Sequence, residues 1–261
     1  MNNDFFSFSL NLVAEAGNII KENFLKKKKA RMKSRREILT DTDIKVEKKI
    51  INAVRAGFPG MAFISEETNP DAADSGECVY LDPIDGTNNF YYGIPFVAVS
   101  FAYYKKGIGR FGIVYNPILD EMFVGIKGKG AFLNGGRIRV SKTVVVRDAL
   151  LATGLPYIRK KNGNNNLKNI LNFGLASRDI RRMGSASLDM CYTAKGVFDG
   201  YWELGLKAWD IAAGAVILRE AGGQCTNFFS ENLDLCAGNF LATNGVLHPE
   251  MRKILKMEGL R

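Results

Sequence analysis

Histidine and cysteine are scarce in this chain of 261 residues. The one histidine, His248, cannot build a multi-histidine metal site, and the chain has no G-x-S-x-G segment of the kind that serine hydrolases use. The four cysteines, Cys78, Cys191, Cys225 and Cys236, are too far apart for a zinc motif such as C-x2-C, so we expect buried, reduced thiols. Catalytic chemistry must therefore come from carboxylates, hydroxyls, lysines or the backbone.

Long apolar runs are also missing. The longest, residues 96–104, is interrupted by Ser100 and is far shorter than the roughly 18 residues of a membrane-spanning helix. The N-terminal residues lack the positive charges and the cleavage site of a signal peptide, so we expect a cytoplasmic location. Hydrophobic residues make up 46% and charged residues 24%, which is typical of a soluble globular protein with one large or two modest domains.

Acidic residues are absent from residues 26–36 (KKKKARMKSRR), which contain eight basic residues. The net charge of the chain is +9, so the rest of the sequence is nearly neutral and the basic excess is local. Like charges repel, and we expect a mobile loop or a solvated hairpin here. The segment either has no partner, or binds RNA or an acidic protein through salt-dependent contacts.

Hydrophobic periodicity predicts two halves that differ in the order of their helices and strands. In the first half we expect helices over residues 4–25 and from an N-cap at 40–43 to Gly57, and strands at 61–64, 78–81, 96–104, 111–115 and 122–126. In the second half we expect strands at 149–153, 179–183, 197–202 and 240–243, and helices at 165–176, 185–194, 209–221 and 249–257. This pattern predicts an N-terminal α+β subdomain (1–142) and a C-terminal α/β subdomain (143–261), with His248 on the surface.

Three acidic clusters follow predicted strands or begin a predicted helix. They are Glu66-Glu67, the D-P-I-D-G-T segment at residues 82–87, and Trp209-Asp210. In the second cluster two carboxylates lie three residues apart on a turn that the proline stiffens, and carboxylates are the ligands that Mg²⁺ prefers. Taken singly, a solvated turn and an N-terminal helix residue also explain such clusters.

In order along the chain, these clusters resemble the signature of the inositol monophosphatase family, the Mg²⁺-dependent, lithium-sensitive sugar phosphatases. The matching segments are S-E-E (65–67), D-P-I-D-G-T-N-N-F (82–90) and W-D-I-A-A-G (209–214), and the resemblance covers about residues 5–255. It implies a layered αβαβα sandwich of two closely packed subdomains, of the α+β or α/β class, and a homodimer. It also implies that metal-activated water hydrolyses a phosphate monoester, foremost inositol monophosphate.

The resemblance also implies a role for each matching residue. The first Mg²⁺ is expected on Glu66, Asp82 and the Ile84 carbonyl, and the second on Asp82, Asp85 and Asp210. Glu66 is also expected to help bind a weaker third ion, and it is one of the expected catalytic residues. Thr87 and Asp43 are expected to orient the attacking water. Substrate is expected on the Gly86 and Thr87 amides, the backbone of Gly184, Ser185 and Ala186, the side chains of Glu203 and Asp210, and Lys33.

Three departures from the family pattern bear on the substrate. Ser65 stands where the family usually has glycine, Asn88 where threonine is common, and Lys207 near the substrate rim. Adenosine 3′,5′-bisphosphate, fructose-1,6-bisphosphate and histidinol phosphate are therefore alternative substrates. The N-N-F after D-G-T and the position of Glu203 favour the inositol type over the nucleotide type.

Overall fold

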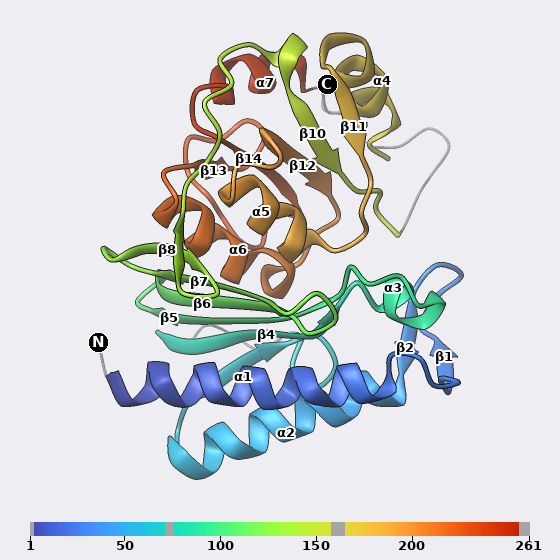
Figure 1. Cartoon of the computed structure of the whole chain (residues 1–261), viewed down its shortest axis with the longest axis vertical. Helices are drawn as coiled ribbons and strands as arrows, with labels where there is room; N and C mark the ends of the chain where they lie inside the picture. Colours follow the sequence, from blue (N-terminus) through green and yellow to red (C-terminus); the bar gives the residue numbers. More distant parts are fainter. Residues whose placement is uncertain (1–2, 71–75, 158–164, 256–261) are drawn as a thin grey trace.

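The computed structural model describes residues 3–70, 76–157 and 165–255, which form five layers (Figure 1). The first layer is the helix pair α1 (Asn3–Asn23) and α2 (Asp41–Gly57), which covers one face of a seven-stranded sheet. In spatial order this sheet contains β3 (Ala62–Ser65), β4 (Glu77–Asp85), β5 (Ala98–Lys105), β6 (Ile108–Asn116), β7 (Glu121–Ile126), β8 (Gly130–Leu133) and β9 (Gly136–Ile138). Its strand pairs are antiparallel except β3–β4.

A five-stranded sheet forms the fourth layer. In spatial order it contains β11 (Asp179–Arg181), β10 (Leu150–Thr153), β12 (Gly200–Leu204), β14 (Asn239–Thr243) and β13 (Gln224–Thr226). Helices α5 (Ala186–Ala194) and α6 (Ala208–Glu220) fill the third layer between the sheets, and α4 (Leu167–Ala176) and α7 (His248–Ile254) form the fifth. The predicted αβαβα sandwich is therefore confirmed.

Alternation along the strands builds the three cores between these layers. In β4, Val79 and Leu81 pack with α1 and α2, whereas Cys78 and Tyr80 pack with α5 and α6. Successive strand residues face opposite sides of a sheet, so a strand covered on both faces is buried along its length. The two sheets are joined by residues 139–149, which include a short 3₁₀ turn at Val146–Asp148. The division into subdomains there stays a prediction.

Helix α6 lies directly on the seven-stranded sheet because two glycines face it. Gly112 of β6 and Gly125 of β7 are opposite one another in the antiparallel register. A Cβ atom would lie 2.4 Å from the Ala213 carbonyl oxygen at Gly112, and 2.6 Å from the Ile217 Cα at Gly125. Only glycine leaves room for the helix backbone here, and this contact fixes the height of α6 above the sheet.

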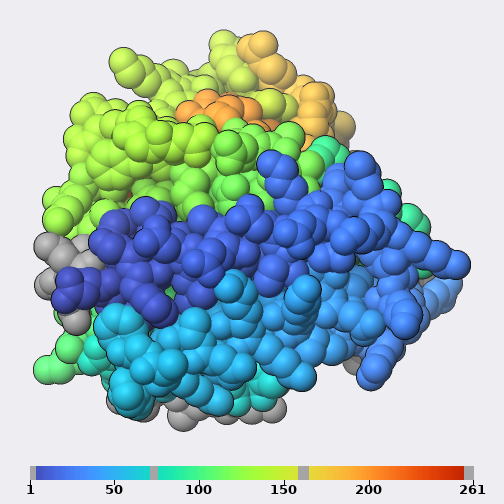
Figure 2. Space-filling view, turned by 60° about the horizontal axis from the view of Figure 1, so that its bottom comes forward, coloured from blue at the N-terminus to red at the C-terminus, as the bar shows by residue number. Residues whose placement is uncertain are grey.

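The basic segment forms a hairpin, as one of the two sequence interpretations predicts. Strand β1 (Ala30–Met32) pairs antiparallel with β2 (Ile38–Thr40), and the hairpin projects beyond the end of α1 at the edge of the helical face (Figure 2). The Lys28 ammonium lies 4.8 Å from the centre of the Phe90 ring, a cation–π contact that ties the segment to the body of the protein.

Three expectations from the sequence are wrong. Strand β4 does not stop before Asp82 but continues to Asp85 through a β-bulge, where Pro83 needs no N–H for the ladder. His248 is buried, and its ring nitrogens each lie 3.0 Å from a hydroxyl, of Thr226 and Thr243. Cys236 is exposed, unlike the other three thiols. Within the described part of the chain, no helix has both the length and the apolarity to cross a membrane.

Candidate active site

A cavity of about 1160 Å³ collects most of the residues that the sequence singles out. It lies where the ends of β3 and β4 meet the N-terminal ends of α5 and α6. Its walls include Lys33, Glu66, Asp82, Ile84, Asp85, Gly86, Thr87, Gly184, Ala186, Glu203 and Asp210. The remaining two, Asp43 and Ser185, are buried directly behind this wall and contact residues within it.

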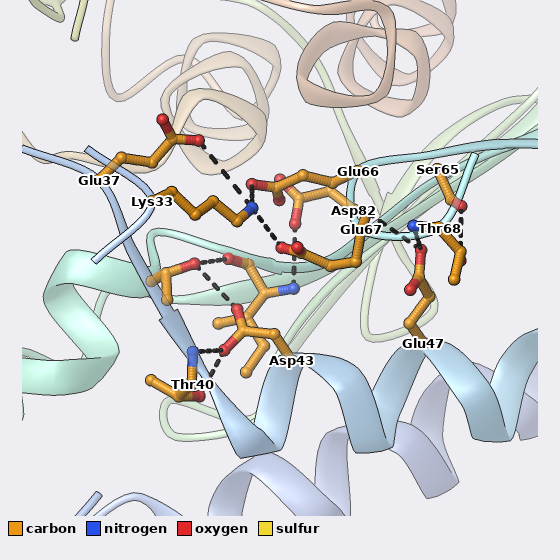
Figure 3. Close-up of polar contacts among 12 residues, drawn as sticks. Lys33, Glu37, Thr40, Asp43, Glu47, Ser65, Glu66, Glu67, Thr68 and Asp82 are labelled. Carbon is orange, nitrogen blue, oxygen red and sulfur yellow. Dashed lines mark hydrogen bonds and ion pairs between the residues drawn. The ribbon is translucent and has the colours of Figure 1, made fainter. Parts of the chain in front are cut away.

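Glu66 and Glu67 follow β3, and a lysine from the hairpin binds both. The Lys33 ammonium lies 2.9 Å from Glu66 Oε1 and 2.6 Å from Glu67 Oε1 (Figure 3). Burial alone lowers the pKa of Lys33, but the two carboxylates raise it above its ordinary value, so the lysine stays protonated. Burial and the neighbouring Glu66 raise the pKa of Glu67 to about 7.

Asp82 and Ile84 lie on the bulged end of β4. Asp82 Oδ1 accepts a hydrogen bond of 3.0 Å from the Ile84 amide, which fixes the carboxylate above the strand. Burial raises the pKa of Asp82 well above its usual value, and Glu66, Asp85 and Asp210 raise it further by repulsion. The bulge therefore places a carboxylate and a backbone carbonyl, that of Ile84, next to other acidic groups.

Asp85 caps helix α5 across the two halves of the chain. Its carboxylate accepts hydrogen bonds from the Ser185 hydroxyl at 2.7 Å and from the Ala186 and Ser187 amides at 3.2 and 2.6 Å. Burial raises the pKa of Asp85, although these hydrogen bonds act in the opposite direction. The Ser185 side chain is thus occupied with Asp85, and Ser185 is left with only its backbone for the substrate contact that the family resemblance implies.

Asp210 reaches the cavity from the first turn of α6. Its Oδ2 accepts a hydrogen bond of 2.7 Å from the Lys207 amide, so the carboxylate caps the helix that contains it. Burial raises the pKa of Asp210 well above its usual value, and repulsion from Asp85 adds to the effect. Its position depends on α6, and hence on the close contact of that helix with Gly112 and Gly125.

The donor set of this cavity fits a hard divalent cation. Four carboxylates, those of Glu66, Asp82, Asp85 and Asp210, share one cavity with the Ile84 carbonyl, and oxygen donors of this kind bind Mg²⁺. Burial and mutual repulsion disfavour their charged forms, and a bound cation would offset both costs. Among the described residues, no three acidic, histidine or cysteine side chains are placed so that they could hold a metal ion as they stand.

Thr87 and Asp43 form a hydroxyl–carboxylate pair beside these carboxylates. The Thr87 hydroxyl is 3.0 Å from Asp43 Oδ1 and 2.9 Å from the Ile84 carbonyl oxygen, and Asp43 Oδ2 accepts a 2.9 Å hydrogen bond from the Thr40 amide. Burial raises the pKa of Asp43 to about 6, with Glu66 adding to this and the hydrogen bonds opposing it. The single Thr87 proton has acceptors inside the protein, so its oxygen is free to accept a hydrogen bond from the cavity side.

Gly86 joins β4 to the short helix α3 (Thr87–Tyr92), which the sequence did not predict. Its φ of +91° lies in the left-handed region, and a Cβ atom would lie 2.9 Å from the Phe96 carbonyl oxygen. The turn therefore requires glycine, and it places the Gly86 and Thr87 amides at the start of a helix. Asn88, in this helix, donates a 3.1 Å hydrogen bond to the Arg36 carbonyl and holds the hairpin.

Glu203, in β12 (Gly200–Leu204), lines the same cavity. Its Oε2 accepts a 2.6 Å hydrogen bond from the Tyr201 hydroxyl, two residues earlier on β12. A Cβ atom at Gly154 would lie 1.9 Å from the same oxygen, so glycine is required to admit this carboxylate. Sequence reasoning missed Gly154 and Arg182, which also line the cavity, and gave Tyr201 no role although it belongs to a segment that matches the family. The position of Gly154, directly after the strand predicted at 149–153, was the one available signal.

Comparisons with known proteins agree with this geometry. The Inositol monophosphatase family matches residues 1–258. A protein of Haemophilus influenzae named Nus factor SuhB is 36% identical over 252 residues, which are 95% of this chain and 94% of that protein. Inositol monophosphatase 3 of Solanum lycopersicum is 39% identical over 260 residues, 96% of each chain.

A solved structure supports the same assignment. The inositol monophosphatase from Anabaena (Nostoc) superposes with a TM-score of 0.88 at 31% identity, over 97% of this chain and 96% of that one. The family match spans almost the whole sequence, and the relatives are covered over nearly their full length. This chain belongs to the inositol monophosphatase family.

Proposed function

We propose that this protein is a Mg²⁺-dependent phosphatase that hydrolyses phosphate monoesters of polyols, with inositol monophosphate as its substrate. The observation that supports this is the single cavity in which carboxylates from the ends of β3 and β4 and the start of α6 meet the Thr87–Asp43 pair. Relatives from several bacteria are named inositol-1-monophosphatase, at 36–38% identity. The cavity offers oxygen donors, a hydroxyl and cations, which are the groups that phosphate-ester hydrolysis requires.

The proposed metal ligands are those that the family pattern assigns. Glu66, Asp82 and the Ile84 carbonyl would hold one Mg²⁺, Asp82, Asp85 and Asp210 a second, and Glu66 a weaker third. Bound Mg²⁺ supplies charge neutralisation at the phosphoryl oxygens and lowers the pKa of a bound water. Asp85 and Asp210 are already fixed by their capping hydrogen bonds, so little reorganisation accompanies binding at these two groups.

The other residues of the chain orient the reactants. The Asp43 carboxylate accepts a hydrogen bond from the Thr87 hydroxyl, which turns a lone pair of the hydroxyl oxygen toward the cavity, where it would orient the attacking water. The Gly86 and Thr87 amides hold the phosphate at the start of α3. Glu203, fixed by Tyr201, accepts hydrogen bonds from the hydroxyl groups of the polyol.

Two cationic side chains on the cavity wall favour a second class of substrate, the bisphosphates. Arg182 and Lys207 line the cavity on the side of the second sheet, and both are exposed. A second anionic group on the substrate would meet these cations. Fructose-1,6-bisphosphate and adenosine 3′,5′-bisphosphate therefore belong in the same assay.

A panel of phosphate esters tests the proposal. Phosphate release from inositol 1-phosphate, both bisphosphates and histidinol phosphate is measured with Mg²⁺ and with EDTA, and again with millimolar Li⁺. We expect Mg²⁺-dependent, Li⁺-inhibited release that is fastest from inositol 1-phosphate. Release that persists in EDTA would contradict the mechanism, and much faster hydrolysis of adenosine 3′,5′-bisphosphate would replace the proposed substrate.

Binding of a nucleic acid or an acidic protein, and the formation of a homodimer, are also predictions. Besides Lys33, whose ammonium binds Glu66 and Glu67, five cations of residues 26–36 are exposed, namely Lys26, Lys27, Lys29, Arg31 and Arg35. They favour a polyanionic partner such as RNA, and a filter-binding titration over salt concentration tests this idea. Multi-angle light scattering tests the homodimer that the family resemblance implies.

A further inference from the structure

The hairpin places a lysine directly on a proposed metal ligand. The Lys33 amide donates a 2.9 Å hydrogen bond to the Glu37 carbonyl, which closes the turn between β1 and β2. Lys33 Nζ then lies 2.9 Å from Glu66 Oε1 and 2.6 Å from Glu67 Oε1, between the two carboxylates (Figure 3). The Lys33 and Glu67 side chains are 23% and 7% exposed, so this ion pair is partly shielded from water.

Glu67 is held in place independently of Lys33. The buried carboxylate of Glu47, on α2, accepts 3.2 Å hydrogen bonds from the amides of Glu67 and Thr68. These bonds fix the turn after β3, and with it the direction of the Glu67 side chain (Figure 3). Within the part of the chain that the structure describes, the Glu67 carboxylate has Lys33 as its hydrogen-bond partner.

The two carboxylates therefore differ in what they can do with Lys33. Glu66 lines the cavity beside Asp82 and is a ligand for the metal, so an ammonium and a divalent cation compete for it. Glu67 makes the shorter contact with Lys33 and is not among the proposed metal ligands. A cation that takes Glu66 leaves Lys33 bound to Glu67, still at the cavity.

We propose that Glu67 is a positioning residue that acts through Lys33. It keeps the ammonium at the mouth of the cavity for the phosphate group when metal occupies Glu66, and it weakens the hold of Lys33 on Glu66 before metal binds. This inference rests on the proposed function, because it uses Glu66 as a metal ligand.

The rest of the hairpin supports this arrangement from both halves of the protein. The Arg36 guanidinium donates a 3.1 Å hydrogen bond to the Tyr157 carbonyl, beyond β10, and the Arg36 carbonyl accepts one of 3.1 Å from Asn88. The turn is thus anchored on two sides of the cavity. Lys33 can exchange partners without detachment of the whole hairpin.

A double-mutant cycle with Mn²⁺ as the probe tests the proposal. Mn²⁺ affinity is measured by calorimetry on the full-length protein for wild type, Lys33→Met, Glu67→Gln and the double variant. We expect Lys33→Met to tighten Mn²⁺ binding about tenfold, because the competing ammonium is gone. Glu67→Gln should weaken it several-fold, because Glu66 is then the one carboxylate within hydrogen-bond distance of Lys33, with Glu37 farther away at 3.9 Å. The double variant should bind as tightly as Lys33→Met, since Glu67 has no effect without its lysine.

Simple addition of the two effects predicts a different result for the double variant. If the two single effects were independent, the double variant would bind Mn²⁺ only slightly more tightly than wild type, and that result would overturn the proposal. Glu121→Gln is the matched control, because Glu121 also binds a lysine, Lys195, at 2.8 Å but does not line the cavity. Thermal melts are recorded for every variant to check that each one is folded.

Two further measurements separate this inference from the proposed function. Trypsin binds the side chain of the lysine after which it cleaves, and Arg36 anchors the hairpin independently of Lys33. Glu67→Gln should therefore make cleavage after Lys33 at least fivefold faster in the presence of Mg²⁺, when neither Glu66 nor residue 67 holds this side chain. For inositol 1-phosphate, Glu67→Gln should raise KM about tenfold and change kcat less. Absence of hydrolysis in wild type would refute the proposed function, whereas an unchanged cleavage rate in Glu67→Gln would refute the role of Glu67.

Discussion

Replacing Gly112 with alanine tests whether the height of α6 above the sheet controls the active site. The added Cβ atom would lie 2.4 Å from the Ala213 carbonyl oxygen and 2.9 Å from its Cα. Both atoms belong to the helix backbone, so no side chain can rotate to make room. Ala213 is one helical turn from Asp210, so a shift of α6 at this point also moves the proposed metal ligand.

The size of the effect follows from these distances. Ordinary contact begins at 3.4 Å, so α6 must retreat by about 1 Å. Overpacking of this kind costs about 1–3 kcal/mol, which lowers Tm by roughly 3–10 °C in a protein of this size. A misplacement of about 1 Å in a catalytic group reduces activity by about 10²-fold. Stability and activity should therefore fall together.

Differential scanning fluorimetry and Mg²⁺-dependent phosphate release provide the two readouts. Gly174→Ala is the matched control, because Gly174 is inside α4 and a Cβ atom there would be 3.9 Å from its nearest neighbour. That control should raise stability by about 0.5–1 kcal/mol, since alanine favours a helix over glycine. A Gly112→Ala protein with wild-type Tm and activity would refute the argument.

Three further changes test other parts of the structure. Asp85→Asn should abolish Mg²⁺-dependent turnover while the far-ultraviolet circular dichroism spectrum stays native, because a ligand charge is lost without core volume. Glu203→Ala should alter the ratio of kcat/KM among polyol phosphates more than Mg²⁺ affinity. Burial lowers the pKa of His248 from 6.5 to about 4, so the unfolded chain binds protons more readily, and stability should fall by up to about 3 kcal/mol as pH drops from 6.5 to 4.

Each of these expectations has an outcome that contradicts it. Undiminished turnover in Asp85→Asn would remove Asp85 from the ligands, and loss of Mg²⁺ affinity in Glu203→Ala would contradict its substrate role. For His248, urea titrations across this pH range are compared with His248→Gln, which should lack that part of the pH dependence. Equal pH profiles would show that other groups cause it.

Local patterns in the sequence predict the elements but not their contacts. The helix that begins near Thr40 follows from a residue that caps it and from the apolar spacing behind it. The structure confirms this N-cap and adds a reciprocal hydrogen bond to Asp43, which completes a capping box. The continuation of β4 to Asp85 was not predictable, because the D-P and D-G pairs favour turns. Pairing with β5 across a bulge outweighs that local preference.

The burial of His248 shows the same limit. Its position before a proline at the start of a helix indicated the surface, and the two threonine hydroxyls that bind its ring come from β13 and β14. Partners that are distant in sequence leave no periodic signal, so a single sequence cannot reveal them. Two other contacts join residues that are distant in sequence. Lys33 binds Glu66 and Glu67, and Gly154 leaves room for the Glu203 carboxylate.

The sequence by itself determined the chemistry of this protein: acidic segments in a fixed order, almost no histidine, and a family pattern over nearly the whole chain. Only the tertiary structure decided how these groups act together, because their positions relative to one another depend on contacts between segments that are distant in the sequence. Asp85 is held by the start of α5, Asp43 by Thr40 and Thr87, and Asp210 by a helix that two glycines admit to the sheet. Such positions depend on packing between layers, and packing is a property of the folded chain.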